Sequence, residues 1–256
     1  MNSFIFLAAF GLAAVAASSG PQRILGGQLT TIANYPYAAA LLNTRNGVNY
    51  VQECGGVILS RRSILTAASC FYFTSPQSWY VRVGSSYANS GGYTHSVSEL
   101  IRHPQFELFN QNDVGIMRIA STFAIGPNVQ LGRFAGEDYN VTDNQPVRTI
   151  GWGSVNGSSN SRSEQLRFVN IRTVNQDVCR RNYNVISITV YPETMCAGIL
   201  TQNNIGACDG DIGGPLIHGT DVVLGIASFN AGCGNQKYPT VYSRVPHFIN
   251  WIRSNA

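Results

Sequence analysis

The sequence predicts an all-β protein with a short C-terminal helix. Short apolar or alternating stretches recur along the chain, among them Trp79 to Val83 and Val222 to Ile226. Clusters of Gly, Asn, Ser and Pro separate these stretches, which is typical of strands and turns in a barrel or sandwich. Only the end of the chain, after Pro246, has apolar side chains at helical spacing, namely Phe248, Ile249, Trp251 and Ile252.

The composition indicates a folded, turn-rich chain. Of its 256 residues 44% are apolar and 12% are charged, and no block of like charge is present. These values argue against disorder, collagen and coiled coil. The net charge of +4 is not clustered, so we expect no nucleic-acid partner. Lys237 is the only lysine among 17 cationic residues, and arginine stays protonated in a strongly alkaline fluid, although drift in Arg usage explains the bias equally well.

The N-terminus has the pattern of a secretory signal peptide. Phe4 to Ala17 is an uncharged run that ends in small side chains and is too short to span a bilayer. We therefore predict a signal peptide over residues 1–17, with a buried N-terminal helix as the alternative. No other segment is long and apolar enough to cross a membrane, so we expect a secreted protein without a membrane partner.

Six cysteines in an exported chain predict disulfides, with 15 possible pairings. None of them has CxxC spacing and no histidine lies close to a cysteine in sequence, so we expect neither a metal site nor a cofactor. Two tripeptides are candidate glycosylation acceptors, at Asn140 and Asn156.

Seven segments, in order along the chain, carry a family resemblance. They are RILGG from Arg23, CGGVILSRRSILTAASC from Cys54, DVGIMRI from Asp113, GWG from Gly151, CAG from Cys196, CDGDIGGPL from Cys208 and PTVYSRV from Pro239. Together they resemble the trypsin-like branch of the chymotrypsin-fold serine proteases. ANSGG, SEQLR, TVNQDVC and the closing helix look most like the insect digestive members.

The resemblance implies the domain organisation and the disulfides. We expect two six-stranded antiparallel β-barrels with the active cleft between them over residues 24–256, preceded by a short propeptide over residues 18–23. The implied disulfides are Cys54–Cys70, Cys179–Cys196 and Cys208–Cys233. Arg23-Ile24 resembles the zymogen cleavage site, and Asp211 resembles the carboxylate that receives the new amino terminus.

The reacting positions depart from the family pattern. This family uses a nucleophilic serine, a histidine as base and a buried aspartate. Asp113 matches the aspartate, but Ser69 stands at the position of the base and Ile212 at that of the nucleophile. The backbone N–H groups of Gly210 and Ile212 could still form an oxyanion hole. Ser69 is too short to fill the space of an imidazole, so we expect either ordered water that links Asp113 to Ser69 and Ser228 or solvent that enters from the open cleft.

The primary pocket departs as well. Gly206 stands at its base, where trypsins have an aspartate, so we expect no trypsin specificity. Asn230 and Thr240 stand where many relatives have glycine and would narrow the pocket towards small apolar groups. Phe229 replaces a tryptophan beside the backbone-binding strand, next to Ser228.

These departures lead to three hypotheses. The first is a secreted, catalytically inactive serine protease homolog, not an enzyme, which acts as a monomer by binding protease inhibitors or other proteases, with the gut lumen as a candidate location. The alternative is an active digestive serine endopeptidase of narrow elastase-like or chymotrypsin-like specificity that works through an unrecognised base and nucleophile. A nutritional or structural protein without a ligand is the third.

Overall fold

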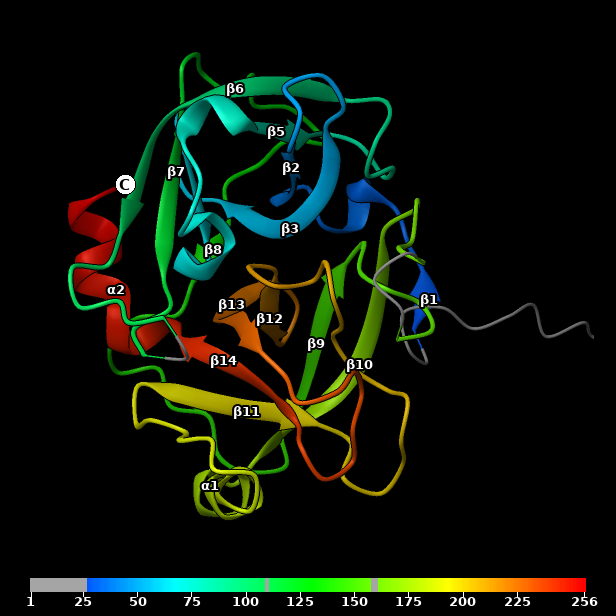
Figure 1. The fold of residues 1–256 in the computed structure, drawn as a ribbon, viewed down its shortest axis with the longest axis vertical. Helices are drawn as coiled ribbons and strands as arrows, with labels where there is room; N and C mark the ends of the chain where they lie inside the picture. The colour runs from blue at the N-terminus through cyan, green and yellow to red at the C-terminus, as the bar shows by residue number, and fades with distance from the viewer. Residues whose placement is uncertain (1–26, 109–110, 158–160) are drawn as a thin grey trace, which may run out of the picture.

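The computed structural model describes residues 27–108, 111–157 and 161–256. Its first barrel is a closed ring of six antiparallel strands in the order β2-β3-β4-β7-β6-β5 (Figure 1). The strands are β2 (Ala38–Asn43), β3 (Val51–Ile58), β4 (Ser63–Thr66), β5 (Trp79–Val83), β6 (Tyr93–Arg102) and β7 (Gly115–Ile119). Alternate side chains of β5 are buried, as its alternating sequence WYVRV predicts.

The second barrel is also a ring of six antiparallel strands, β9-β10-β11-β14-β13-β12, which closes because β9 and β10 pair. The strands are β9 (Pro146–Gly151), β10 (Arg167–Val174), β11 (Thr194–Gly198), β12 (Pro215–His218), β13 (Val222–Phe229) and β14 (Thr240–Arg244). Two short strands extend this sheet: β1 (Gln28–Leu29) pairs with β10, and β8 (Arg133–Phe134) runs parallel to β13. The prediction of two six-stranded barrels is therefore confirmed.

The predicted C-terminal helix is α2 (Val245–Ser254), which buries Phe248, Ile249 and Ile252. It follows β14 of the second barrel and lies beside β7 of the first (Figure 1). A hydrogen bond of 3.1 Å from Arg118 on β7 to the backbone oxygen of Asn255 fixes this position. The helix thus ties the two barrels together.

A second helix was not expected from the sequence. Helix α1 (Gln176–Asn184) begins after Asn175, whose side chain accepts hydrogen bonds from the N–H groups of Asp177 and Val178. Three short 3₁₀ helices complete the elements: η1 (Ile32–Asn34), η2 (Ala68–Phe71) and η3 (Pro76–Ser78). Among the described residues, none of the helices combines the length and the apolar character needed to cross a membrane.

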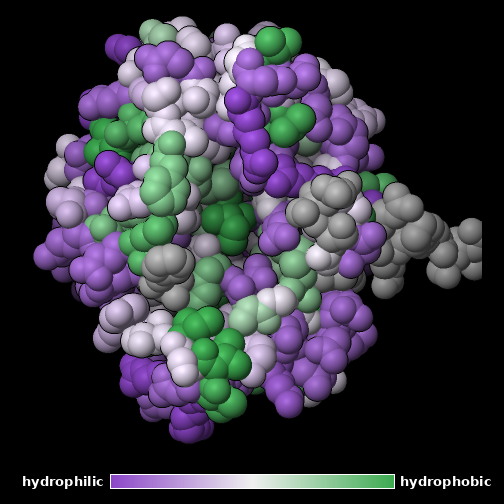
Figure 2. Space-filling view, in the orientation of Figure 1, coloured by the Kyte–Doolittle hydropathy of each residue, from purple (hydrophilic) through white to green (hydrophobic). Residues whose placement is uncertain are grey.

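One hydrophobic core continues from the first barrel into the second. Residues of the first, such as Val57 and Leu65, belong to the same buried cluster as Ile150 and Leu216 of the second. In Figure 2, hydrophobic side chains lie in the hollow between the two barrels, and most of the surrounding surface is hydrophilic. The shared core fixes the two barrels against each other and so fixes the residues that line this hollow.

Candidate active site

Ser69 and Asp113 meet in the first barrel. Helix η2 carries Ser69, and Asp113 precedes β7, where the left-handed backbone of Asn112 (φ 50°) turns the chain. The Ser69 N–H donates to Asp113 Oδ1 at 2.8 Å, and the Ser69 hydroxyl donates to Asp113 Oδ2 at 2.9 Å. Ser228 on β13 of the second barrel donates to the same Oδ2 at 2.6 Å. The three predicted residues are therefore in contact.

This arrangement corrects the expectation that water would bridge Asp113 to Ser69 and Ser228. The serine side chain is shorter than an imidazole, but η2 brings both its N–H and its hydroxyl within direct hydrogen-bond distance of the carboxylate. The Ser228 hydroxyl also reaches Asp113 directly. Direct contacts satisfy the carboxylate because the backbone, not only the side chain, of Ser69 faces it.

Asp113 is a buried carboxyl with a raised pKa. Its residue is 3% exposed, and burial raises the pKa because the charged form loses hydration. Hydrogen bonds from Ser228, from Ser69 and from the backbone of Ala68 oppose that rise without cancelling it. The Asp113 carboxyl group therefore holds its proton more readily than an exposed aspartate does. Ser69, which donates to it, is exposed.

Ile212 lies in the loop between Cys208 and Gly214, close to η2. Its half-buried side chain packs against the cores of both barrels and offers no heteroatom for nucleophilic attack. Its backbone oxygen accepts a hydrogen bond of 2.7 Å from the N–H of Gly55. The sulfur of Cys70, the neighbour of Ser69, approaches the same oxygen to 3.7 Å. The two departures from the family pattern, at Ser69 and Ile212, are thus neighbours in space.

The predicted oxyanion donors keep a suitable backbone. Gly210 has a φ of 93°, a conformation that favours glycine. Within the described parts of the chain, the N–H groups of Gly210 and Ile212 donate no hydrogen bond to another protein group. Gln52, which the sequence analysis missed, donates from its side-chain amide to the Gly210 oxygen at 2.6 Å and to the Cys54 oxygen at 3.1 Å. The sequence carried no signal for this contact.

Asp211 is held by the backbone of its own barrel. Its carboxylate accepts hydrogen bonds from the N–H groups of Gly153 at 2.8 Å and Cys208 at 3.0 Å. Burial raises its pKa to about 6, against the lowering effect of these hydrogen bonds. Arg23 and Ile24, its predicted activation partners, lie outside the described residues.

The predicted pocket residues gather at one end of β13 and β14. Gly206 and Thr240 are buried, and a side chain added at Gly206 would begin 4.0 Å from the Thr240 hydroxyl. Phe229 and Asn230 are half-buried at the end of β13, and the Phe229 ring packs edge-on against Tyr183 at 5.6 Å. Thr240 therefore narrows the space over Gly206, and the base itself carries no carboxylate.

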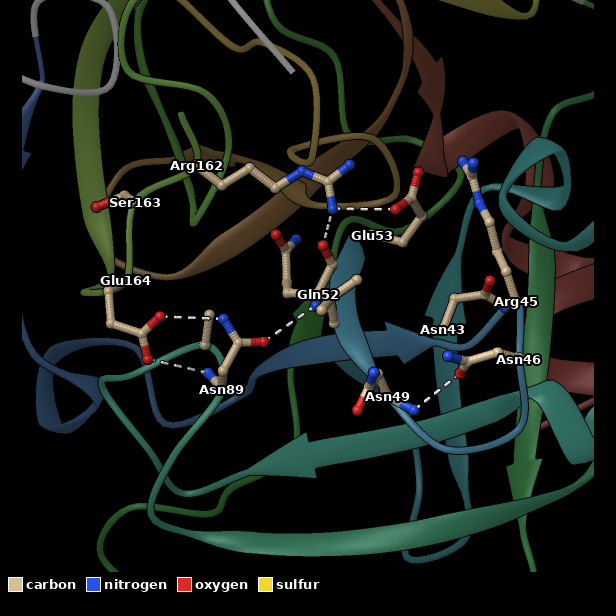
Figure 3. A pocket seen from close by; sticks show the side chains of 12 residues that line it. Asn43, Arg45, Asn46, Asn49, Gln52, Glu53, Asn89, Arg162, Ser163 and Glu164 are labelled. Carbon is tan, nitrogen blue, oxygen red and sulfur yellow. Dashed lines mark hydrogen bonds and ion pairs between the residues drawn. The ribbon is translucent and has the colours of Figure 1, made fainter. Parts of the chain in front are cut away.

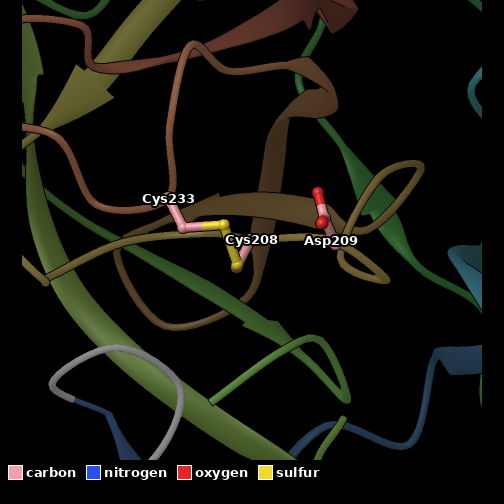
Figure 4. Close-up of side chains that lie close together, drawn as sticks. All are labelled: Cys208, Asp209 and Cys233. Carbon is pink, nitrogen blue, oxygen red and sulfur yellow. A yellow bond between two sulfur atoms is a disulfide. The ribbon is translucent and has the colours of Figure 1, made fainter. Parts of the chain in front are cut away.

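The three implied disulfides are present as Cys54–Cys70, Cys179–Cys196 and Cys208–Cys233. Among the described residues, Cys208, Asp209 and Cys233 are the one group of three whose potential metal-ligand atoms lie within 4.8 Å of one another (Figure 4). Because the two sulfurs are bonded to each other, they cannot act as thiolate ligands. The glycosylation candidates Asn140 and Asn156 are exposed, although Ser158 of the second tripeptide lies outside the described residues.

The comparisons with known proteins agree on one family. A protein-family model described as Trypsin matches residues 24–252. The chain belongs to the trypsin family. It is 45% identical to "Trypsin, alkaline A" of Manduca sexta and 42% identical to "Trypsin CFT-1" of Choristoneura fumiferana, in both cases over the full length of both chains. It is also 40% identical to "Achelase-1" of Lonomia achelous over 91% of this chain and all of that protein.

These relatives contradict the first hypothesis from the sequence. Proteins 42–45% identical over the full length are named trypsins, which are enzymes, so the interpretation of the chain as a non-enzyme that acts only by binding is corrected. That interpretation depended on Ser69 and Ile212 standing at the reacting positions. Ile212 has no oxygen, nitrogen or sulfur in its side chain, so it cannot itself act as the nucleophile.

Proposed function

We propose that this chain is a secreted digestive endopeptidase of narrow specificity, in which Ser69 is the nucleophile and Asp113 is its base. The observation that carries the proposal is the hydrogen bond of 2.9 Å from the Ser69 hydroxyl to Asp113 Oδ2. A nucleophilic hydroxyl needs a base within hydrogen-bond distance. Burial raises the pKa of Asp113, which makes its carboxylate a stronger base than an exposed aspartate.

The proposed reaction balances with the groups at the site. Ser69 Oγ attacks the carbonyl carbon of the scissile peptide bond and its proton passes to Asp113. The tetrahedral oxyanion is stabilised by the N–H groups of Gly210 and Ile212. The C–N bond then breaks, Asp113 returns the proton to the leaving amine, and water hydrolyses the acyl ester on Ser69.

Ser228 has a positioning role in this proposal. Its hydroxyl donates to Asp113 Oδ2 at 2.6 Å, and the Ser69 N–H donates to Oδ1 at 2.8 Å. These two bonds hold the carboxylate in one orientation toward the Ser69 hydroxyl. The base position carries a serine and not an imidazole, so we expect turnover well below that of an enzyme with a complete triad, whose groups contribute about 10⁶ in kcat.

The pocket supports a preference for small side chains. Gly206 supplies no anion for a substrate arginine or lysine, and the Thr240 hydroxyl lies close to the space above it. Asn230 adds a second side chain at the half-buried end of β13. We therefore propose cleavage after alanine, serine, valine or similar residues.

Secretion into an alkaline gut lumen is part of the same proposal. The run from Phe4 to Ala17 supports export, and three disulfides are typical of an oxidising compartment. Three full-length relatives carry the word alkaline in their names. The arginine bias of this chain is compatible with such a fluid, since arginine keeps its charge there.

The experiment is turnover of a peptide library with varied P1 residue by the protein cleaved after Arg23. We expect slow hydrolysis after small P1 residues, loss of that hydrolysis in Ser69→Ala, and no change in the control Ser96→Ala, an exposed serine on β6 outside the site. Absence of turnover above the uncatalysed rate, or equal turnover in Ser69→Ala, would refute the proposal.

Protein inhibitors and other proteases remain proposed partners of the cleft. Inhibitor complexes use interfaces of standard size whose contacts do not depend on the reacting atoms. Competition between an inhibitor and the small-P1 peptide substrate would test whether both use this cleft.

A further inference from the structure

A polar cavity of about 730 Å³ lies apart from the Ser69–Asp113 pair. The connection between β2 and β3 forms one wall, and residues 88–89 and 162–164 form the other (Figure 3). Its volume falls within the range of small-molecule sites. Nothing in the proposed peptidase reaction uses it.

The wall from the β2–β3 connection presents unused hydrogen-bonding groups. The side chains of Arg45 and Asn49 make no hydrogen bond or ion pair within the described residues, and both are exposed. Asn46 uses its oxygen to hold the local turn, which leaves its NH₂ group for a ligand. Asn43 donates to the Ser78 oxygen at 3.2 Å and keeps its own oxygen as an acceptor. This wall offers both donors and acceptors.

The opposite wall is ordered by paired groups. Glu164 accepts from the Asn89 side chain at 3.0 Å, and Arg162 forms an ion pair of 3.0 Å with Glu53. Two arginines, Arg45 and Arg162, balance two glutamates, so the formal charge of the lining is zero. A strongly charged ligand is therefore disfavoured.

The edge of β3 is closed to an added peptide strand here. The N–H of Gln52 donates to the Asn89 side chain at 3.1 Å, and its backbone oxygen accepts from Arg162. Strand addition depends on free backbone groups of this kind. The lining contains Val51 and Ala88 but no aromatic or long apolar side chain that would hold an apolar peptide residue.

Gln52 also lines the cavity. The residue is 2% exposed, yet its side-chain oxygen accepts no hydrogen bond within the described chain. That oxygen has almost no exposed surface, so a ligand in the cavity cannot reach it, and recognition falls to the exposed groups of the β2–β3 wall. A hydroxyl group is the simplest neutral donor that is also an acceptor.

From these observations we propose that the cavity binds a neutral oligosaccharide. Adjacent hydroxyls of a sugar match the mixed donors and acceptors of Asn43, Asn46 and Asn49, and the ligand needs neither net charge nor a free strand edge. Arg45 contributes further donors from the rim. Arg45, Asn46 and Asn49 take no part in the proposed peptidase chemistry.

Saturation-transfer NMR with maltotriose, cellotriose and N-acetylated chitotriose tests the proposal on the full-length protein. We expect transfer to at least one of these sugars, with a Kd of about 1 mM or tighter. Asn49→Ala and Arg45→Ala should each weaken binding about fivefold, the usual effect of losing one hydrogen bond. Within the described chain neither side chain has a protein partner to lose, so an unchanged thermal midpoint is the folding control.

The matched control is Asn128→Ala, an exposed asparagine outside the cavity, which should bind like the parent protein. Three results would overturn the proposal: no transfer to any of the three sugars, equal binding by Asn49→Ala and the parent, or transfer to unstructured tripeptides in place of sugars. A failure of peptide hydrolysis would leave all of these readouts unaffected.

Discussion

Replacement of Asp211 by Asn removes a buried carboxyl whose pKa burial raises to about 6, from an ordinary value of 3.8. Between these two pH values the folded protein holds a proton that the unfolded chain has already released. Asp211 therefore makes the free energy of unfolding fall as pH rises from about 4 to about 6. Above that range its contribution no longer changes with pH. At 1.36 kcal/mol per pKa unit, the difference is about 3 kcal/mol.

Urea denaturation of the uncleaved protein at several pH values between about 4 and about 7 measures this contribution of Asp211 to the free energy of unfolding. The parent should lose about 3 kcal/mol across the interval relative to Asp211→Asn, which lacks the titrating group. The comparison between the two proteins cancels the contributions of all other titrating groups. Parallel stability curves for parent and variant would refute the reasoning, and so would a parent that gains stability relative to the variant.

Cleavage after Arg23 supplies a second arm of the same test. The resemblance implies that the new ammonium of Ile24 pairs with Asp211. A nearby cation favours the ionised carboxyl and lowers its pKa. The loss of stability between about pH 4 and about pH 6 should then shrink or disappear in the cleaved protein, while Asp211→Asn should respond to cleavage much less.

Three further predictions concern the cleft. Asp113→Ala should lower the free energy of unfolding by about 2 kcal/mol in urea denaturation, because the buried Ser228 hydroxyl and the Ser69 N–H lose their acceptor; an unchanged midpoint would contradict this. Ile212→Ser alone should leave peptide turnover unchanged, whereas the double variant with Ser69→His should raise it by several orders of magnitude, up to about 10⁶; equal turnover in both would contradict the assignment of roles. Thr240→Gly should extend the P1 preference from small to larger apolar residues in a peptide-library assay, and an unchanged preference would contradict the proposed pocket.

The architecture and the disulfides could be predicted because the motifs are spaced over the whole chain. The block from Cys54 to Cys70 and the block from Cys208 fix the resemblance to one fold, and the fold brings the cysteines together. The C-terminal helix was visible because its apolar side chains recur at helical spacing. Where the sequence carried periodicity or motif spacing, the prediction of the fold was confirmed.

Helix α1 was missed for a physical reason. Its sequence QDVCRRNYN is mostly polar, and only Cys179 and Tyr183 are buried, so no continuous apolar face is present. The capping side chain of Asn175 and Asp177 in the first turn were the available signals. Local capping, rather than hydrophobic periodicity, defines this helix.

The site was predicted in part. The sequence placed Ser69, Asp113 and Ser228 near one another, but it could not show that the Ser69 backbone N–H faces the carboxylate. It also gave no sign that the Gln52 amide reaches across to Gly210 in the other barrel. Contacts of this kind depend on how two barrels pack, which motif spacing does not encode.

Covalent labelling shows directly whether Ser69 is the nucleophile. The protein cleaved after Arg23 is treated with a fluorophosphonate, and the modified residue is located by peptide mass spectrometry, with an active trypsin as the positive control. We expect slow labelling on Ser69 that disappears in Asp113→Asn, since the hydroxyl then loses its base. No label on the chain under conditions that modify the control, or a label on another residue of the cleft, would contradict this expectation.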